Sequence, residues 1–144
     1  MLISDVLRVK GTQVITVTPD TTVRQLVAVL AEHRIGAVVV SNDGMTVDGI
    51  VSERDVVQAL ARRGAAVMSA QVTAIYTAQV HTVTPQSPIE DVMLMMTERR
   101  VRHAPVVADG RLHGIVRIGD VVKIRLGELQ AERTALTDYI TGTR

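Results

Sequence analysis

The chain has 144 residues, 47% of them hydrophobic and 22% charged, so it is long enough and apolar enough to fold around a core throughout its length. Sixteen Lys and Arg against fifteen Asp and Glu leave a formal charge of +1, which excludes a broad electrostatic attraction to nucleic acid or anionic lipid. Cysteine is absent, and its absence excludes disulfides, thiolate metal sites and thiol catalysis.

Two further classes of protein are disfavoured by the same composition. The first ten residues lack the pattern of a secretory signal, and no apolar run approaches the length of a membrane span, so we expect no membrane partner and a cytoplasmic location. The aromatic residues are two tyrosines, too few for the stacking platforms of a nucleic-acid binder. The core must therefore be aliphatic.

The first half of the chain predicts the element order β-α-β-β-α. Residues 14–17 are a short β-branched run, and residues 23–30 carry apolar side chains at helical spacing. The apolar runs 37–40 and 49–51 are joined by a turn, which is typical of a hairpin. A second helix is expected from about Arg54 to Arg63.

The second half of the chain repeats this order. The stretch that begins at Val80 aligns with the one at Val14, an offset of 66, and GIVRIGDVV at Gly114 aligns with GIVSERDVV at Gly49, an offset of 65. In the second copy Ser87-Pro88-Ile89-Glu90 predicts a capping box, with the proline at the first helical position.

One copy alone exposes a face of its small sheet, so two copies are expected to bury these faces against each other. We therefore predict an α+β fold in which two βαββα repeats pack pseudo-twofold into one globule, with clefts along the seam. The expected parts are the first repeat at 9–63, a linker at 64–75, the second repeat at 76–128 and a C-terminal helical extension at 129–144.

The C-terminal helix carries a stripe of mostly apolar residues at four-three spacing. Its members are Val122, Leu126, Leu129, Arg133, Leu136 and Ile140. The stripe either packs over the N-terminal segment 2–7 or contacts a second protomer, and we favour the homodimer.

The pattern Gly-apolar-apolar-Ser/Thr-x-x-Asp that closes the copies, with RHAPVV before its second occurrence, resembles a tandem pair of cystathionine-β-synthase (CBS) domains, also called a Bateman module. The resemblance covers nearly the whole chain. It implies that the clefts between the copies bind an adenosine compound (AMP, ADP, ATP, NAD or S-adenosylmethionine) and that the module regulates a separate effector protein. The alternative is a structural or oligomerisation module whose clefts bind nothing.

Asp55 and Asp120 each follow a short strand and lie in the first turn of a helix. A carboxylate fixed in this way can accept hydrogen bonds from both hydroxyls of a ribose. The residues around Asp55 equally fit a helix cap with Ser52 as the N-cap. Ribose binding is favoured because the aspartate persists in the second copy although Arg117 replaces the serine, which the family uses to assist at the ribose.

The resemblance also implies phosphate and adenine contacts. Phosphate is expected at Arg54, Arg102, His103 and Arg117, because arginine suits phosphate oxygens and histidine can donate to them. Arg117 departs from the family pattern: it either fills the second cleft or adds a phosphate contact, and we favour the contact. The residues expected around the base are Val14, Ile35, Gly36, Ala37, Val80, Val101 and Arg102.

Catalysis and metal binding are not predicted. The four histidines, at 33, 81, 103 and 113, have no spacing that places two on one helix face. The sequence shows no pairing of a nucleophile with a histidine and no glycine fingerprint of a phosphate loop or dinucleotide fold. We therefore expect no catalytic residues, no metal and no catalytic cofactor.

Overall fold

The structure, a computed structural model, describes residues 1–142 of the chain. Its elements in chain order are α1 (Ile3–Lys10), β1 (Thr16–Val17), α2 (Val23–His33), β2 (Ala37–Val40), β3 (Gly49–Ser52), α3 (Glu53–Arg63), the 3-10 turns η1 (Ala65–Ser69) and η2 (Val72–Ala74), α4 (Ile89–Arg99), β4 (His103–Ala108), β5 (Arg111–Arg117) and α5 (Ile118–Thr141).

The strands form two small sheets, one from each copy. The first sheet has the order β1-β2-β3, with β1 parallel to β2 and β2 antiparallel to β3. The second sheet is the antiparallel pair β4-β5. In place of a strand equivalent to β1 it has a single parallel bridge between Val83 and Val106. The predicted α+β fold of two βαββα repeats is confirmed, with a first strand shorter than the predicted 14–17.

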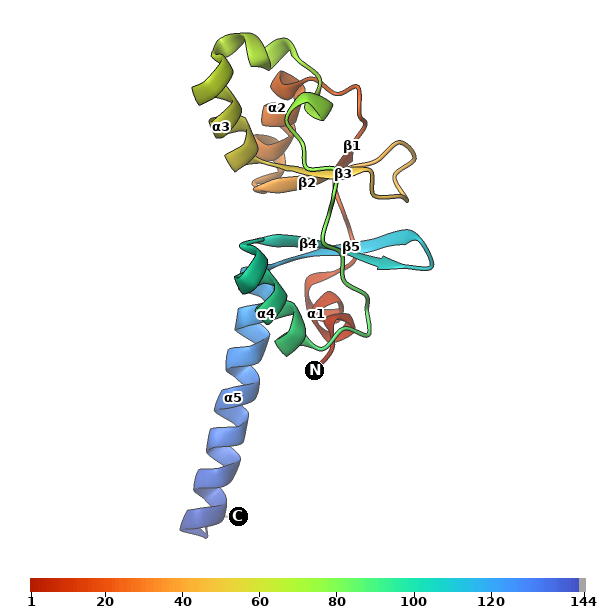
Figure 1. Cartoon of the computed structure of the whole chain (residues 1–144). Helices are drawn as coiled ribbons and strands as arrows, with labels where there is room; N and C mark the ends of the chain where they lie inside the picture. Colours follow the sequence, from red (N-terminus) through yellow and green to blue (C-terminus); the bar gives the residue numbers. More distant parts are fainter. Residues whose placement is uncertain (143–144) are drawn as a thin grey trace.

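The sheets lie in the middle of the molecule and the helices lie outside them (Figure 1). Helices α2 and α3 cover the first sheet, and α1, α4 and the start of α5 cover the second. Each copy thus has its own core between sheet and helices, centred on Leu26 and Val38 in the first copy and on Ile89 and Val106 in the second. The two cores therefore lie on either side of the seam between the sheets, where clefts can form.

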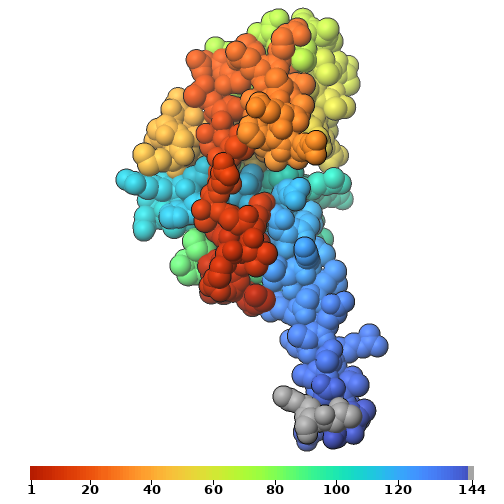
Figure 2. All heavy atoms as spheres, turned by 180° about the vertical axis from the view of Figure 1, so that it is seen from behind, coloured from red at the N-terminus to blue at the C-terminus, as the bar shows by residue number. Residues whose placement is uncertain are grey.

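The segment before each copy packs on the core of the other copy. Helix α1 precedes the first copy but buries Ile3, Val6 and Leu7 in the second core, beside the start of α5 (Figure 2). The 3-10 turns η1 and η2 precede the second copy but cover the first, where Val72 is part of the core. Residues 64–75, expected as a linker, are therefore part of the packing of the first copy.

These crossing segments explain the glycine repeated in the two motifs. A Cβ on Gly49 would lie 2.3 Å from the Tyr76 ring, and one on Gly114 would lie 2.7 Å from Cδ2 of Leu7. Real Cβ atoms do not approach other heavy atoms so closely. Each glycine therefore leaves room for the segment that arrives from outside its own copy.

The predicted capping box at Ser87 is wrong. Helix α4 begins at Ile89 with Pro88 as its N-cap, and it has no side-chain cap. The hydroxyl of Ser87 instead accepts a hydrogen bond from the N–H of Thr84 at 3.0 Å, so a turn before the helix uses the serine. A capping box does begin α2, where Thr22 and Gln25 exchange hydrogen bonds.

Helix α5 packs on the molecule only at its beginning and then projects away from it (Figure 1). Its buried side faces α1 and α4 through Val121, whereas Leu126, Leu136 and Ile140 of the predicted stripe are 54–73% exposed. Of the predicted extension 129–144, residues 143 and 144 lie outside the described residues. Within the described part, no helix is both long and apolar enough to cross a membrane, and the cytoplasmic location stays a prediction.

Candidate functional site

A cleft of about 280 Å³ opens at the seam beside the motif of the first copy. We call it the first cleft. It brings together predicted residues from both copies: Gly36, Ala37, Ser52, Arg54, Asp55, Val80, Val101, Arg102 and His103 all line it. Six residues that we did not predict also line it: Ile50, Glu53, Thr77, Gln79, His81 and Arg100.

The carboxylate of Asp55 is held in place by the start of α3. Its Oδ2 accepts hydrogen bonds from the N–H of Ser52 at 2.9 Å and from the Ser52 hydroxyl at 3.1 Å. The Asp55 N–H donates to the same hydroxyl at 3.3 Å. Among the described residues, no hydrogen bond to Oδ1 of Asp55 is found. The helix-cap interpretation of Asp55 is thus confirmed, and the cap leaves one acceptor oxygen in a half-buried position.

Gly36, the residue before β2, lines both clefts. A Cβ there would lie 3.4 Å from Oε1 of Glu53 and 3.7 Å from Cε1 of His103, which are ordinary van der Waals contacts, so the position does not require a glycine. The carbonyl of Gly36 accepts the N–H of Glu53 at 2.9 Å. This hydrogen bond joins the residue before β2 to the start of α3.

A second cleft, of about 230 Å³, lies beside the motif of the second copy. Its lining is Lys10, Gln13, Ile15, Arg34, Ile35, Gly36, Ala37, His103, Ile115 and Arg117. Ile35, Gly36, Ala37, His103 and Arg117 of the predicted set are brought together here. Val14 and Asp120 of the predicted set are not in this lining. Ile15, the neighbour of Val14, lines the cleft, and so do Lys10 and Arg117, the two partners of Asp120.

The carboxylate of Asp120 has charged partners, unlike that of Asp55. Its Oδ2 accepts from Nζ of Lys10 at 2.6 Å and from the N–H of Arg117 at 2.9 Å, and its Oδ1 lies 3.6 Å from the Arg117 guanidinium. Burial works to raise the pKa of Asp120, but the hydrogen bonds from Lys10 and Arg117 and their positive charges outweigh it, so the pKa lies below its usual value. Asp120 is therefore a carboxylate already paired.

His103 stands between the two clefts and lines both of them. Burial lowers its pKa, and the positive charges of Arg117 and Lys10 lower it further, against the opposing effect of Glu53 and Asp120. At neutral pH the imidazole is neutral, and it can both donate and accept a hydrogen bond.

A wider hollow, of about 780 Å³, lies beside the clefts, and neither Asp55 nor Asp120 lines it. It is a groove between α2, α3 and the start of α5, with Val27, Leu30 and Val57 on its apolar side, and the predicted residues Arg102, His103 and Arg117 also line it. The two smaller clefts are the candidate ligand sites because each lies beside one of the two motifs.

Sequence reasoning missed four charged residues of the clefts: Lys10, Arg34, Glu53 and Arg100. Arg34 and Arg100 carried a signal, since they lie 66 residues apart at equivalent positions, and both adopt left-handed backbone with φ of 54°. This conformation costs a non-glycine residue about 1 kcal/mol or more, and such costs gather at functional sites. Lys10 carried no signal, because α1 itself was not predicted.

Metal chemistry gains no support from the structure. Among the described residues, no group of three or more His, Cys, Asp or Glu side chains is placed to hold a metal ion. What the clefts offer instead is the fixed carboxylate of Asp55, cationic side chains and aliphatic walls. This is an arrangement for binding a polar ligand rather than for transforming one.

Comparison with known proteins agrees with the geometry. The family model described as "CBS domain" matches residues 3–62 and 72–127. The chain is 36% identical over 148 residues to the CBS domain-containing protein CBSX3, mitochondrial, of Arabidopsis thaliana, which covers 97% of this chain and 72% of the relative. In three dimensions it is similar to the CBS-domain containing protein ATU1752 from Agrobacterium tumefaciens, with a TM-score of 0.83 and 44% identity over 87% of this chain and 99% of that one.

Two similar solved structures contain ligands. The CBS domain protein PAE2072 from Pyrobaculum aerophilum is complexed with AMP, and it shares 26% identity and a TM-score of 0.74 over 83% of this chain and 89% of its own. The CBS domain pair of protein MJ0100 is in complex with 5'-methylthioadenosine and S-adenosyl-L-methionine, at 25% identity and a TM-score of 0.77 over 89% and 98%. The protein therefore belongs to the CBS-domain family, as a non-catalytic tandem CBS pair.

Proposed function

We propose that the protein is a regulatory module that binds an adenosine nucleotide of the AMP, ADP, ATP or NAD type and acts in trans on an effector protein. The observation that carries this proposal is Asp55, a carboxylate that lines the first cleft, with Oδ2 used by its cap and, among the described residues, no hydrogen bond found to Oδ1. Similar CBS proteins with bound AMP or S-adenosyl-L-methionine support the adenosine class of ligand.

In this proposal the ribose lies against the first turn of α3. Asp55 accepts hydrogen bonds from the ribose hydroxyls, and Ser52 beside it assists. Because such bonds to a charged acceptor contribute about 1.5–3 kcal/mol, their loss weakens binding roughly tenfold to a hundredfold. Asp120 has the equivalent role in the second cleft.

The other groups of the ligand meet the rest of the lining. Arg54, Arg102 and His103 line the first cleft as donors for phosphate, and Arg117 does so in the second cleft. The base has no aromatic platform, so it must pack between aliphatic residues of both copies. These are Ala37, Val80 and Val101 in the first cleft, with Ile35 and Gly36 in the second. Val14, also expected at the base, lines neither cleft, and its neighbour Ile15 lines the second.

A thermal unfolding panel with AMP, ADP, ATP, NAD and S-adenosylmethionine tests the proposal. A ligand at one hundred times its dissociation constant stabilises the folded state by about 2.7 kcal/mol, which raises the midpoint by several degrees at this chain length. Asp55→Asn should remove the part of the shift that comes from the first cleft, because asparagine fits the cap but carries no charge. Asp91→Asn is the matched control, since Asp91 occupies the same third position of α4. A flat panel would favour the oligomerisation module.

We also propose that the module acts as a homodimer. The projecting half of α5 exposes Leu129, Leu136 and Ile140 on the stripe face, and an isolated apolar stripe on a helix is stable when a partner covers it. Light scattering should show a dimer that Leu136→Lys dissociates and that Gln130→Lys, off the stripe, leaves intact. A monomeric wild type would rule the dimer out.

A further inference from the structure

The two clefts differ in charge although their motifs are copies. The first cleft is lined by Arg54, Arg100 and Arg102 against Glu53 and Asp55. In the second cleft the positions of Ser52, Glu53 and Arg54 are occupied by Arg117, Ile118 and Gly119, and its lining holds three permanent cations and no acidic residue. These cations are Lys10, Arg34 and Arg117. Asp120 lies next to this lining and pairs with Lys10 and Arg117, so it offsets one of the three positive charges and leaves an excess of two. The first cleft, with three arginines against two carboxylates, has an excess of one. The second cleft therefore has the stronger demand for a negatively charged ligand.

Lys10 already occupies the position where a ribose would bind Asp120. The Nζ to Oδ2 distance is 2.6 Å, and both side chains are largely withdrawn from solvent, with 26% and 18% of their area exposed. A ribose hydroxyl must therefore displace an ammonium group from Asp120. No such displacement is needed at Asp55, whose side-chain partner is the uncharged hydroxyl of Ser52.

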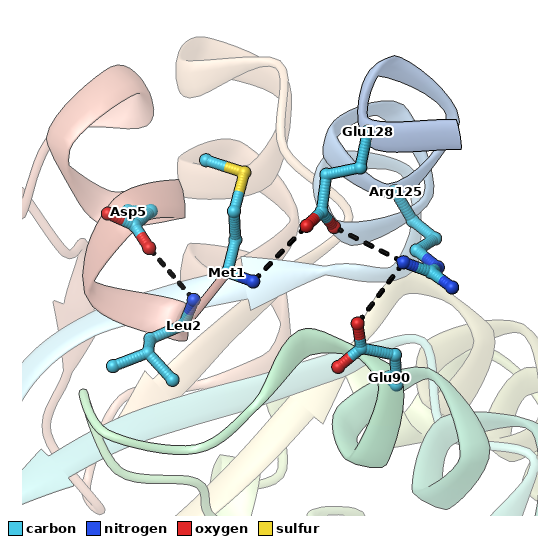
Figure 3. Close-up of polar contacts among 6 residues, drawn as sticks. All are labelled: Met1, Leu2, Asp5, Glu90, Arg125 and Glu128. Carbon is cyan, nitrogen blue, oxygen red and sulfur yellow. Dashed lines mark hydrogen bonds and ion pairs between the residues drawn. The ribbon is translucent and has the colours of Figure 1, made fainter. Parts of the chain in front are cut away.

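The backbone of Lys10 is held beside the cleft because α1 packs on the second core through Ile3, Val6 and Leu7. Figure 3 shows a further contact at the other end of the helix, where the Met1 ammonium pairs with Glu128 at 3.2 Å. Arg125 in turn bridges Glu128 at 3.7 Å and Glu90 at 3.2 Å, which joins α1, α5 and α4. A Lys10 ammonium displaced from Asp120 therefore starts beside the cleft, where an anion of the ligand can pair with it.

The chemical class of the ligand decides whether that anion is supplied. A phosphorylated nucleoside brings phosphate oxygens that can accept from Lys10 and Arg117, and charge-assisted hydrogen bonds of this kind are the strong ones. An uncharged thionucleoside brings no anion. S-adenosylmethionine brings one carboxylate together with a sulfonium and an ammonium, so its net charge is positive in a cleft that already has an excess of positive charge. The exchange of partners at Asp120 is therefore most favourable for a phosphorylated nucleoside.

We propose that Lys10 makes the second cleft selective for phosphorylated nucleosides, with a preference that grows with the number of phosphates, over adenosine, 5'-methylthioadenosine and S-adenosylmethionine. Lys10 is thus a specificity-determining residue supplied by the segment that crosses over from the front of the chain. The inference rests on the proposed function, since it assumes that the clefts bind adenosine compounds.

Calorimetric titration of Asp55→Asn, in which the first cleft is weakened, tests the inference with adenosine, AMP, ATP and S-adenosylmethionine as probes. We expect ATP to bind at least tenfold more tightly than AMP, and adenosine and S-adenosylmethionine to bind more weakly still. Adding Lys10→Met should weaken ATP binding about tenfold, flatten its salt dependence and leave adenosine unchanged. Lys10→Arg should restore the ATP preference, and Lys123→Met, which removes an exposed lysine of α5, is the control.

Several results would overturn the inference. If Lys10→Met increased the affinity for ATP and for adenosine by the same factor, Lys10 would block the second cleft and would not discriminate between ligands. Equal binding of S-adenosylmethionine and ATP by Asp55→Asn would show that the charge does not discriminate. If Asp55→Asn bound nothing while the wild type bound one nucleotide, the second cleft would not be a site and the proposed function would stand. Failure of the wild type to bind any probe would remove both proposals.

Discussion

Asp55 and Asp120 occupy the same place in a duplicated motif, yet their carboxylates have different partners. Each accepts the backbone N–H of the residue three positions earlier, at 2.9 Å, and so caps the helix that follows. The remaining bonds come from the uncharged Ser52 in the first copy and from the cationic Lys10 and Arg117 in the second. The comparison teaches that duplication kept the helix cap, while the chemistry offered to a ligand diverged.

The largest expected difference between the copies concerns the two close glycines. Gly49→Ala should lower the free energy of unfolding by about 3 kcal/mol, because the new Cβ meets the Tyr76 ring and also the backbone oxygen of Thr77 at 2.9 Å. Gly114→Ala should cost about 1 kcal/mol, since only the flexible end of Leu7 must move. Urea unfolding of both variants measures the difference, and equal costs would contradict it.

The caps should be similar in strength, with an added cost in the second copy. Asp55→Ala should lower the stability of the unliganded protein by about 1 kcal/mol through loss of the cap. Asp120→Ala should lower it more, because it also leaves Lys10 without its anion among other cations. Chemical denaturation without ligand tests the order. The reverse order would mean that the Lys10 pair contributes nothing.

The neutral His103 between the clefts predicts a pH dependence. Its surroundings are Arg117, Lys10, Glu53 and Asp120, and burial with the two cations keeps its folded pKa below the ordinary 6.5. Below about pH 6.5 His103 binds a proton in the unfolded chain but not in the folded chain. The contribution of the neutral His103 to the free energy of unfolding is therefore present above that pH and is lost as the pH falls toward the folded pKa. His103→Gln should reduce the loss of urea midpoint between pH 7.5 and pH 5.5.

The exposed His113, substituted in the same way, is the control for this measurement. If His113→Gln reduced the loss as much as His103→Gln did, the position between the clefts would have no special role in the pH dependence.

The smallest expected effect is that of Lys10→Met on the unliganded protein. A partly exposed ion pair contributes about 0–1 kcal/mol, so the free energy of unfolding should change by no more than about 1 kcal/mol. A loss well above this value would show that Lys10 is mainly a structural residue. In that case the Lys10→Arg variant, which keeps the positive charge, would be needed to distinguish an effect on ligand preference from an effect on stability.

The repeat made most of the fold predictable. Two aligned copies gave the element order, the hairpins and the aspartates, because apolar periodicity and spacing survive in the sequence. The seam also assembled the predicted Asp55, Ala37 and Val101 into one cleft.

Long-range packing was not predictable from these patterns. Packing of segment 2–7 against the C-terminal helix was one of the two alternatives for the stripe, and α1 does contact the start of α5. That residues 3–10 form a helix, and that its last residue, Lys10, pairs with Asp120, was not predicted. The capping box at Ser87 failed for a related reason: a turn with Thr84 competes for the same hydroxyl, and local propensity does not rank the two alternatives.

The crossing of the two leading segments makes the copies mutually dependent during folding. Deletion of the first ten residues would remove Ile3, Val6 and Leu7 from the core of the far half of the chain and uncover the parts of β5 and α5 that α1 contacts, and it would leave the nearby half covered. We therefore expect that neither half can be obtained alone as a compact monomer. We also expect substitutions in α1 to destabilise the second copy, which is synthesised last.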